Sequence, residues 1–238
     1  MRLTAGAVAL AGFLAAASAA ATPTPFSSAA PGAAMPPPWR VITLPRIERH
    51  TRFDLATVDG TTVLRVAAAG SYANLLHPLD GVPAQRLRWR WRVEQPIEGA
   101  DLTRKEGDDV PARVCVLFDV PLERLALVDR VRVELGRALF DPKLPAASIC
   151  YVWDQRLAPG TWLANAYTDR VQMLVLRRGG YGAWTEESRD LAADFLRAFP
   201  LESSGGTPPL AAIAVSADGD NTGGRSLAYF GDLRLSPP

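Results

Sequence analysis

Apolar and charged residues alternate with a period of two over residues 86–93, Arg-Leu-Arg-Trp-Arg-Trp-Arg-Val. This period is typical of a β-strand with one buried face and does not fit a helix. The strand would bury its apolar residues and align four arginines on its other face, which are Arg86, Arg88, Arg90 and Arg92. Because like charges repel, carboxylates from neighbouring strands or an anionic ligand must lie against this arginine row.

Most of the remaining pattern also favours strands. Expected strands cover residues 39–44, 52–58, 61–68, 86–93, 112–118, 148–153, 171–176, 211–217 and 227–235. Asp59-Gly60 is typical of a tight hairpin turn between two of them. Helices are expected over residues 122–139, after Pro121, and over residues 185–199, with Thr185 as the N-terminal cap. The pattern predicts a mainly β fold, an antiparallel β-sandwich or jelly roll with two peripheral α-helices, and it disfavours a parallel sheet.

The N-terminus has the form of a signal peptide, residues 1–21. Arg2 precedes a short apolar run, and Ala19-Ala20-Ala21 supplies a cleavage site. The run is too short to span a bilayer, so we expect a periplasmic or secreted bacterial protein with no integral membrane anchor after cleavage near Ala21. Residues 22–38, rich in Pro, Ala and Ser, are expected to form a flexible tether, and residues 39–238 a single β-sandwich domain.

Charge and cysteine usage narrow the class of protein. A formal net charge of +1 gives no support to nucleic-acid binding by bulk charge. Cys115 and Cys150 lie in predicted strands and would form a disulfide in an oxidising compartment if those strands are neighbours, or would otherwise be buried thiols. His50 and His77 are distant in sequence, which argues against a histidine-rich zinc site. No serine-hydrolase elbow, phosphate-binding P-loop or zinc-protease motif is present in the sequence.

The arginine row favours a carbohydrate or another polyhydroxylated or anionic small ligand as partner, because guanidinium groups bind carboxylates and phosphates bidentately. Trp162 and Tyr181 lie beside Gly or Pro in expected loops, where a sugar ring could stack on them. Asp194, together with Asp108 and Asp109, would balance the arginines. The candidate ligand-binding residues are Arg88, Arg90, Arg92, Arg113, Trp162, Tyr181 and Asp194.

The segment Gly107–Arg113 carries the candidate catalytic residues, Asp108 and Asp109. Two carboxylates can serve as general acid and base, so an alternative function is a glycan-active hydrolase or lyase. The same acids would otherwise cap a turn or form ordinary salt bridges. A further alternative is a structural cell-envelope protein whose arginines are all used in internal ion pairs.

Residues 218–223, Asp-Gly-Asp-Asn-Thr-Gly, match the first half of a calcium-binding loop, with oxygens at positions one, three and five. Position twelve is Tyr229 rather than a bidentate Glu, and the same residues also form good hairpin turns without an ion. Calcium is the candidate cofactor, with Asp218, Asp220 and Thr222 as its ligands.

Several short motifs occur in order between residues 39 and 235. They are Leu87-Arg-Trp-Arg-Trp-Arg, Gly107-Asp-Asp-Val-Pro-Ala-Arg113, Tyr151-Val-Trp153, a helix-like segment from Trp184 to Phe199, Ala217-Asp-Gly-Asp-Asn-Thr-Gly223, and Ala228-Tyr-Phe-Gly-Asp232. With these motifs the chain resembles the bacterial exported proteins grouped as domain of unknown function 3047. The resemblance implies a domain but no reaction. The end of the chain, 229–235, is also similar to the closing strand of carbohydrate-binding jelly rolls, which is a likeness of fold alone.

Overall fold

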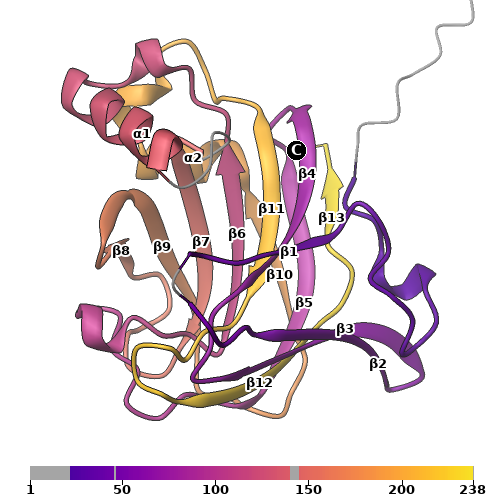
Figure 1. Ribbon diagram of the computed structural model, residues 1–238. Coiled ribbons are helices and arrows are strands. Elements are labelled where there is room, and N and C mark those ends of the chain that lie inside the picture. The colour runs from indigo at the N-terminus through magenta and orange to yellow at the C-terminus, as the bar shows by residue number, and fades with distance from the viewer. Residues whose placement is uncertain (1–21, 46, 140–144, 238) are drawn as a thin grey trace, which may run out of the picture.

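The computed structural model describes residues 22–45, 47–139 and 145–237. The expected signal peptide, residues 1–21, lies outside the described residues. The fold is mainly β and consists of two sheets packed in a sandwich-like arrangement (Figure 1), which confirms the expected fold class.

The seven-stranded sheet has the order β1 (Arg40–Ile42), β4 (Asn74–Val82), β11 (Leu210–Ser216), β6 (Ala112–Phe118), β7 (Ala147–Asp154), β9 (Thr168–Arg178), β8 (Trp162–Asn165). The six-stranded sheet has the order β10 (Thr185–Asp190), β5 (Arg86–Gln95), β12 (Arg225–Phe230), β3 (Thr61–Ala69), β2 (Arg52–Val58), and β13 (Arg234–Ser236) also pairs with β5. All strand pairs are antiparallel except β7 with β9, which is parallel. The sequence pattern disfavoured a parallel sheet, and the structure differs from that expectation in the pair β7 and β9.

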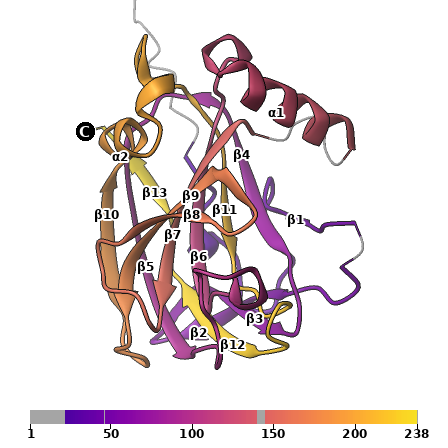
Figure 2. The same ribbon diagram turned by 90° about the vertical axis from the view of Figure 1, so that its left-hand side faces the viewer.

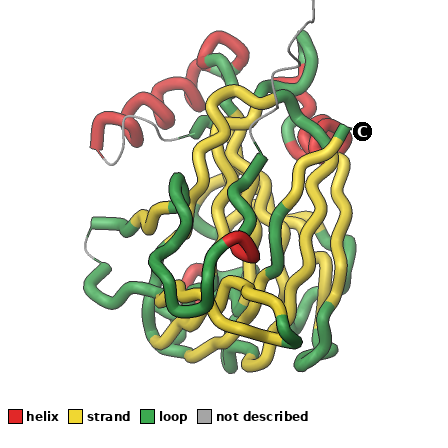
Figure 3. Tube along the Cα trace, turned by 90° about the vertical axis from the view of Figure 1, so that its right-hand side faces the viewer, coloured by secondary structure: helices red, strands yellow, loops and turns green. Residues whose placement is uncertain are grey.

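The two α-helices, α1 (Leu127–Leu139) and α2 (Leu191–Ala198), lie at one end of the sandwich, uppermost in Figures 1, 2 and 3. At the opposite end β2, β3 and β12 run across the page in Figure 1, whereas β6, β7 and β11 of the seven-stranded sheet run up it. The short 3-10 helices are η1 (Phe26–Ser28), η2 (Lys105–Gly107), η3 (Leu122–Arg124) and η4 (Pro200–Ser203). Within the described chain, the helices are all too short or too polar to cross a membrane.

The orientation of β5 follows the predicted alternation. Leu87, Trp89, Trp91 and Val93 are buried, whereas the four arginines between and beside them are half-buried or exposed. Trp89 packs on Tyr151 and Trp91 on Trp153 of β7, with ring centroids 5.4 and 5.5 Å apart, so this aromatic layer joins the two sheets. Buried aromatic pairs contribute about 0.5–1.5 kcal/mol each beyond the area they bury.

Residues 185–190 form strand β10 rather than the first turns of a helix. The prediction of one helix over residues 185–199 is therefore wrong in its first part. Asp190, not Thr185, is the N-terminal cap: its carboxylate accepts hydrogen bonds from the backbone N–H groups of Ala192 and Ala193. The preceding residues alternate in exposure because they pair with β5, and that long-range pairing outweighs their local helical pattern.

Strand β4 was not expected because it contains Pro78 and a turn-like Asp80-Gly81 pair. Both Asp80 and Gly81 have a positive φ, and the neighbouring strand β11 shifts its register between Leu210 and Ala212 at this level. Strand β4 therefore contains an irregularity at Asp80-Gly81, and this irregularity lets the two turn-like residues remain within the strand. Strand β8 was also not expected.

Cys115 and Cys150 form a disulfide. They lie directly opposite each other on the adjacent strands β6 and β7, with their Cα atoms 4.0 Å apart. The structure therefore selects the disulfide over the alternative of two buried thiols.

The structure differs from the expected flexible tether at residues 22–38. This segment lies along the right of Figure 1 and is fixed to the sandwich by buried side chains. The ring of Phe26 is fully buried and packs on Trp39, and Ser27 donates backbone and side-chain hydrogen bonds to Asp232. One aromatic ring thus anchors a segment whose average composition is that of a linker.

His77 holds the start of this segment. Its Nδ1 lies 2.7 Å from the carbonyl oxygen of Pro78, and its Nε2 accepts a hydrogen bond of 3.0 Å from the backbone N–H of Thr24. Burial lowers the pKa of His77 below its ordinary value of 6.5. A protonated imidazole has no acceptor nitrogen, so protonation removes the bond from Thr24.

We therefore expect a pH-dependent contribution from His77 to stability. Since its folded pKa is lowered, this contribution is present above pH 6.5 and is lost as the pH falls through the folded pKa. The difference in free energy of unfolding between wild type and His77→Gln, from urea titrations, should shrink as the pH is lowered from about 7.5 to 5. The exposed His50→Gln is the matched control; an equal pH dependence in both variants would contradict this role for His77.

Candidate functional site

The arginine row of β5 lies on the outer face of the six-stranded sheet, and part of it is neutralised within the protein. Arg86 lies 3.7 Å from Asp190, and Arg92 forms an ion pair with Glu94. Arg90 stacks its guanidinium on the ring of Trp184, 4.6 Å from the ring centroid. Neither Arg88 nor Arg90 has an ion-pair partner among the described residues. Such exposed pairs contribute little stability, about 0–1 kcal/mol each.

The expected acidic partners of this row lie elsewhere. Asp108 and Asp109 precede β6, which pairs with β7 and β11 in the seven-stranded sheet and not with β5. Arg113 of β6 belongs to that sheet as well. The expectation that Asp108 and Asp109 balance Arg88, Arg90 and Arg92 is therefore wrong, because β6 and β5 belong to different sheets.

Asp109 holds the loop 218–224 in place. Its carboxylate is fully buried and accepts hydrogen bonds from the backbone N–H groups of Asn221 and Thr222 and from the hydroxyl of Thr222. Asp108 accepts one bond of 2.6 Å from the side chain of Asn165 through Oδ2, while its Oδ1 has no hydrogen-bond partner within the described chain. Asp109 is thus committed to fold stabilisation, which disfavours the pair as catalytic acid and base.

Arg113 and Asp218 form a buried ion pair with an N–O distance of 2.9 Å. Arg113 also donates to the hydroxyl of Ser216, and Asp218 accepts from the backbone N–H of Val110. Although burial lowers the pKa of Arg113, the adjacent carboxylate of Asp218 raises it overall. Burial raises the pKa of the Asp218 carboxyl to about 7 against the attraction of Arg113.

Two of the candidate calcium ligands take part in the hydrogen bonds and ion pairs of this network. Asp218 accepts a hydrogen bond from the guanidinium of Arg113, and the hydroxyl of Thr222 donates to Asp109. Burial, and after it the charges of Asp109 and Asp108, raises the pKa of Asp220. Within the described residues no three His, Cys, Asp or Glu side chains converge as a metal site. Calcium binding by this loop stays a prediction.

Trp162, Tyr181 and Asp194 do not join the arginine row. Trp162 lies on the edge strand β8 beneath the guanidinium of Arg197, and Tyr181 stacks on the core residue Trp153. Asp194 is buried and accepts hydrogen bonds from Tyr151 and Arg189. These three residues stabilise separate parts of the sandwich.

A different part of the same outer sheet face is hollowed. The middle strand β3 places Ala67 and Ala69 outward, whereas Arg52 of β2 and Leu227 of β12 lie opposite Ala67, and Arg225 of β12 lies opposite Ala69. Small side chains between long ones leave a groove across the strands. The groove lies where β2, β3 and β12 are labelled at the lower end of Figure 1.

This groove, which we call the arginine groove, has a volume of about 630 Å³. Its lining consists of Arg49, His50, Arg52, Arg65, Ala67, Ala68, Ala69, Ser71, Gln95, Arg225, Ser226 and Leu227. These residues include four arginines but no carboxylate and no Trp, Tyr or Phe. The arginine groove is therefore a cationic, largely non-aromatic hollow of the size that small-molecule sites have, about 300–1,000 Å³.

The charge of the arginine groove is mostly uncompensated. Arg65 donates to Asp54 of β2 at 3.0 Å. For Arg49, Arg52 and Arg225, the described part of the chain supplies no carboxylate within ion-pair distance. Ser226, only 3 % exposed, adds a hydroxyl that has no hydrogen-bond partner among the described residues. Ser226 lies on the inner face of β12, opposite the buried Ala68, so its hydroxyl is shielded from a ligand on the outer face.

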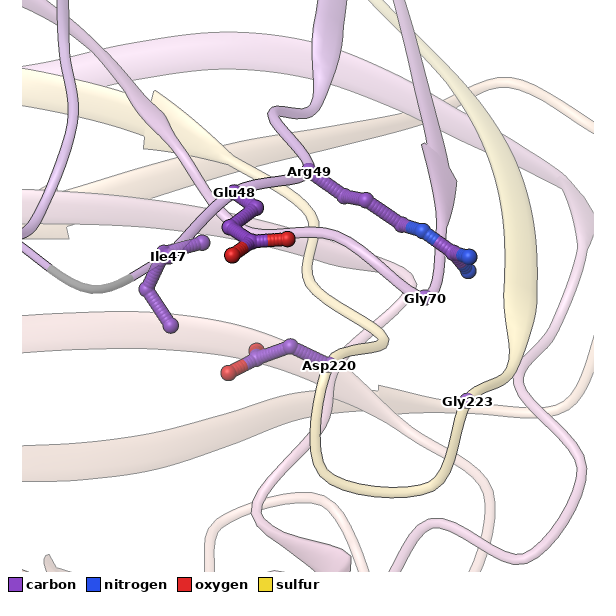
Figure 4. Close-up of a pocket in the computed structure, with 6 residues that line it drawn as sticks. All are labelled: Ile47, Glu48, Arg49, Gly70, Asp220 and Gly223. Carbon is purple, nitrogen blue, oxygen red and sulfur yellow. The ribbon is translucent and has the colours of Figure 1, made fainter.

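Arg49 also borders a second, shallower hollow of about 360 Å³ (Figure 4). There Glu48 and Asp220 lie across from each other, while the side chain of Arg49 extends away from both and over Gly70. The guanidinium of Arg49 is thereby directed to the Gly70 end of the arginine groove. The two hollows differ in the sign of their net charge, because the smaller one is lined by two carboxylates and one arginine.

Sequence reasoning did not identify the arginine groove. Arg52, Arg65 and Arg225 are separated widely in sequence, and each is the usual outward residue of an alternating strand. The available signal was the pair of outward alanines on β3, Ala67 and Ala69, between strands carrying arginine. Recognising it also requires the pairing of β12 with β3, which a single sequence does not specify.

Comparison with protein families gives a match over residues 37–234 to the model described as "Protein of unknown function (DUF3047)". The match spans both sheets, both α-helices and all residues of the arginine groove. No curated protein matches the chain.

Proposed function

Because the chain belongs to the DUF3047 family, whose description names no activity, we propose its function from the geometry of the arginine groove. The protein is an exported β-sandwich that binds an acidic carbohydrate at the outer face of the six-stranded sheet. The observation that carries this proposal is a groove lined by four arginines and no carboxylate.

The chemistry of the lining supports an anionic ligand. Guanidinium groups bind carboxylate and phosphate with paired hydrogen bonds. Gln95 and His50 add polar groups suited to sugar hydroxyls. A neutral sugar has less support here because no aromatic ring lines the groove for stacking. The disulfide and the apolar N-terminal run support export, since disulfides persist in oxidising compartments.

The alternatives have less support. For a glycan hydrolase or lyase, Asp109 is fully occupied by the loop 218–224 and the arginine groove is not lined by a carboxylate pair. For a purely structural envelope protein, the arginines should be paired internally, yet three groove arginines have no such partner in the described chain.

The proposal predicts that Arg52→Ala/Arg225→Ala reduces the affinity for an acidic oligosaccharide by about a hundredfold or more. Each charge-assisted hydrogen bond contributes about 1.5–3 kcal/mol, and 1.4 kcal/mol is tenfold in affinity. Isothermal titration with oligogalacturonate checks this result.

Two variants serve as controls. Arg132→Gln removes an exposed cation from α1 at the other end of the molecule and should leave the affinity unchanged. Arg90→Ala distinguishes the two parts of the sheet face: an unchanged affinity supports the arginine groove, whereas a large loss places the ligand on the arginine row of β5.

A further inference from the structure

The arginine groove has cations at two ends, on β2 and β12, and the arginine of its middle strand β3, Arg65, is paired with Asp54. Arg52 lies on β2 and Arg225 on β12, with β3 between them. Their backbones are therefore two strand spacings apart, about 10 Å, and are displaced along the strands because Arg52 pairs with Ala67 and Arg225 with Ala69. Ala67, Ala69 and Leu227 cover the space between the two arginines.

The end at β12 contains two cations. Arg49 extends over Gly70, which follows Ala69 and donates its backbone N–H to Gly224, the residue before Arg225. Gly70 has a positive φ of 55°, which favours glycine, and Nη1 of Arg49 lies 3.6 Å from the position that a Cβ atom would take there. The guanidinium of Arg49 and the strand start at Arg225 thus lie at the same end of the arginine groove.

The end at β2 contains Arg52. Next to it, the charge of Arg65 on β3 is partly neutralised by Asp54 of β2. A ligand with one anionic group can engage either end but leaves the other end unpaired. A ligand with two or more anionic groups along a chain can neutralise both ends and cross the apolar residues between them.

Resting on the proposed function, we propose that the arginine groove selects oligoanionic chains, in which acidic groups on different units of the chain bind the Arg52 end and the Arg49–Arg225 end at once. The substrate class is a linear oligouronide or an equivalent polyanionic saccharide, rather than a single acidic sugar. Two-point binding raises affinity because the second contact forms within the complex at a high effective concentration.

The test compares galacturonate monomer with tri- and hexagalacturonate by isothermal titration on the full mature chain. We expect the oligomers to bind about a hundredfold more tightly than the monomer. Arg52→Ala and the double variant Arg49→Ala/Arg225→Ala should each reduce the affinity for the hexamer to nearly that for the monomer, while Arg132→Gln changes neither. Circular dichroism spectra and melting curves of all variants identify any that fail to fold, and the milder Arg52→Gln and Arg49→Gln/Arg225→Gln then replace them.

The outcomes separate this inference from the proposed function. Equal affinity for monomer and hexamer, both lost in Arg52→Ala/Arg225→Ala, overturns two-point binding and leaves the anionic carbohydrate site standing. Tight binding of neutral cellohexaose, unaffected by these substitutions, overturns both. If tripolyphosphate binds tightly and the oligouronides do not, two-point anion binding stands and the carbohydrate assignment fails.

Discussion

Asp218→Ala is expected to lower the free energy of unfolding by about 3–5 kcal/mol, because it leaves the buried guanidinium of Arg113 without its counter-charge. The substitution also removes the acceptor for the backbone N–H of Val110, which is buried in the same network. An unpaired buried charge costs more than the ion pair contributes when intact. Urea denaturation of the purified protein at about pH 8.5, where the Asp218 carboxyl is ionised, measures the loss.

A double substitution tests whether the unpaired charge is the cause. Arg113→Met/Asp218→Leu removes both charges and should recover part of the stability lost in Asp218→Ala, since apolar replacements of buried ion pairs are often tolerated. Glu98→Ala, at an exposed acid after β5, is the matched control and should be within about 0.5 kcal/mol of wild type. A loss below about 1 kcal/mol in Asp218→Ala would contradict the assignment of a buried pair.

Removal of the disulfide is expected to have a similar effect. The bond joins residues 35 positions apart, and closing a loop of this length in the unfolded chain corresponds to about 3–4 kcal/mol in the chain-entropy model. Cys115→Ala/Cys150→Ala should therefore unfold at a markedly lower urea concentration than the oxidised wild type, and wild type reduced by dithiothreitol should behave similarly.

Thiol titration supplies the independent measurement for the disulfide. The oxidised, denatured wild type should show no reactive thiol, and the reduced protein should show both cysteines. Two thiols in the protein as isolated under oxidising conditions, or equal stability of the oxidised and reduced forms, would contradict the cross-strand disulfide of β6 and β7.

The sequence predicts well those elements whose pattern is local. The alternation over residues 86–93 sets which residues of β5 are buried, because successive side chains of a strand point to opposite faces. The hairpin of β2 and β3 follows similarly from Asp59-Gly60, with Asp59 and Gly60 both at positive φ. Neither conclusion needs information on distant strands.

The elements for which the structure differs from the sequence prediction depend on contacts between residues that are distant in sequence. Residues 185–190 carry a helix-like pattern, but pairing with β5 makes them a strand. Residues 22–38 have linker composition, but burial of Phe26 fixes them. Composition and periodicity describe the chain's own preferences, and a few long-range contacts outweigh them.

The same limit applies to the site. The arginine row could be predicted because its members are two residues apart in one strand. The arginine groove combines side chains from β2, β3 and β12 and the loop before β2, and its hollow arises from Ala67 and Ala69 being flanked by longer residues. The pairing of β12 with the β2–β3 hairpin, which no local pattern encodes, determines this arrangement.

The central claim, that an acidic saccharide binds in the arginine groove, is tested most directly by mapping the bound ligand on the protein. In a titration of isotope-labelled wild type with hexagalacturonate followed by backbone amide NMR shifts, the largest changes should fall on Ala67–Ala69, Gln95 and Arg225–Leu227. Changes confined instead to the Gly107–Arg113 segment, to the loop 218–224 or to the helical end would contradict the account.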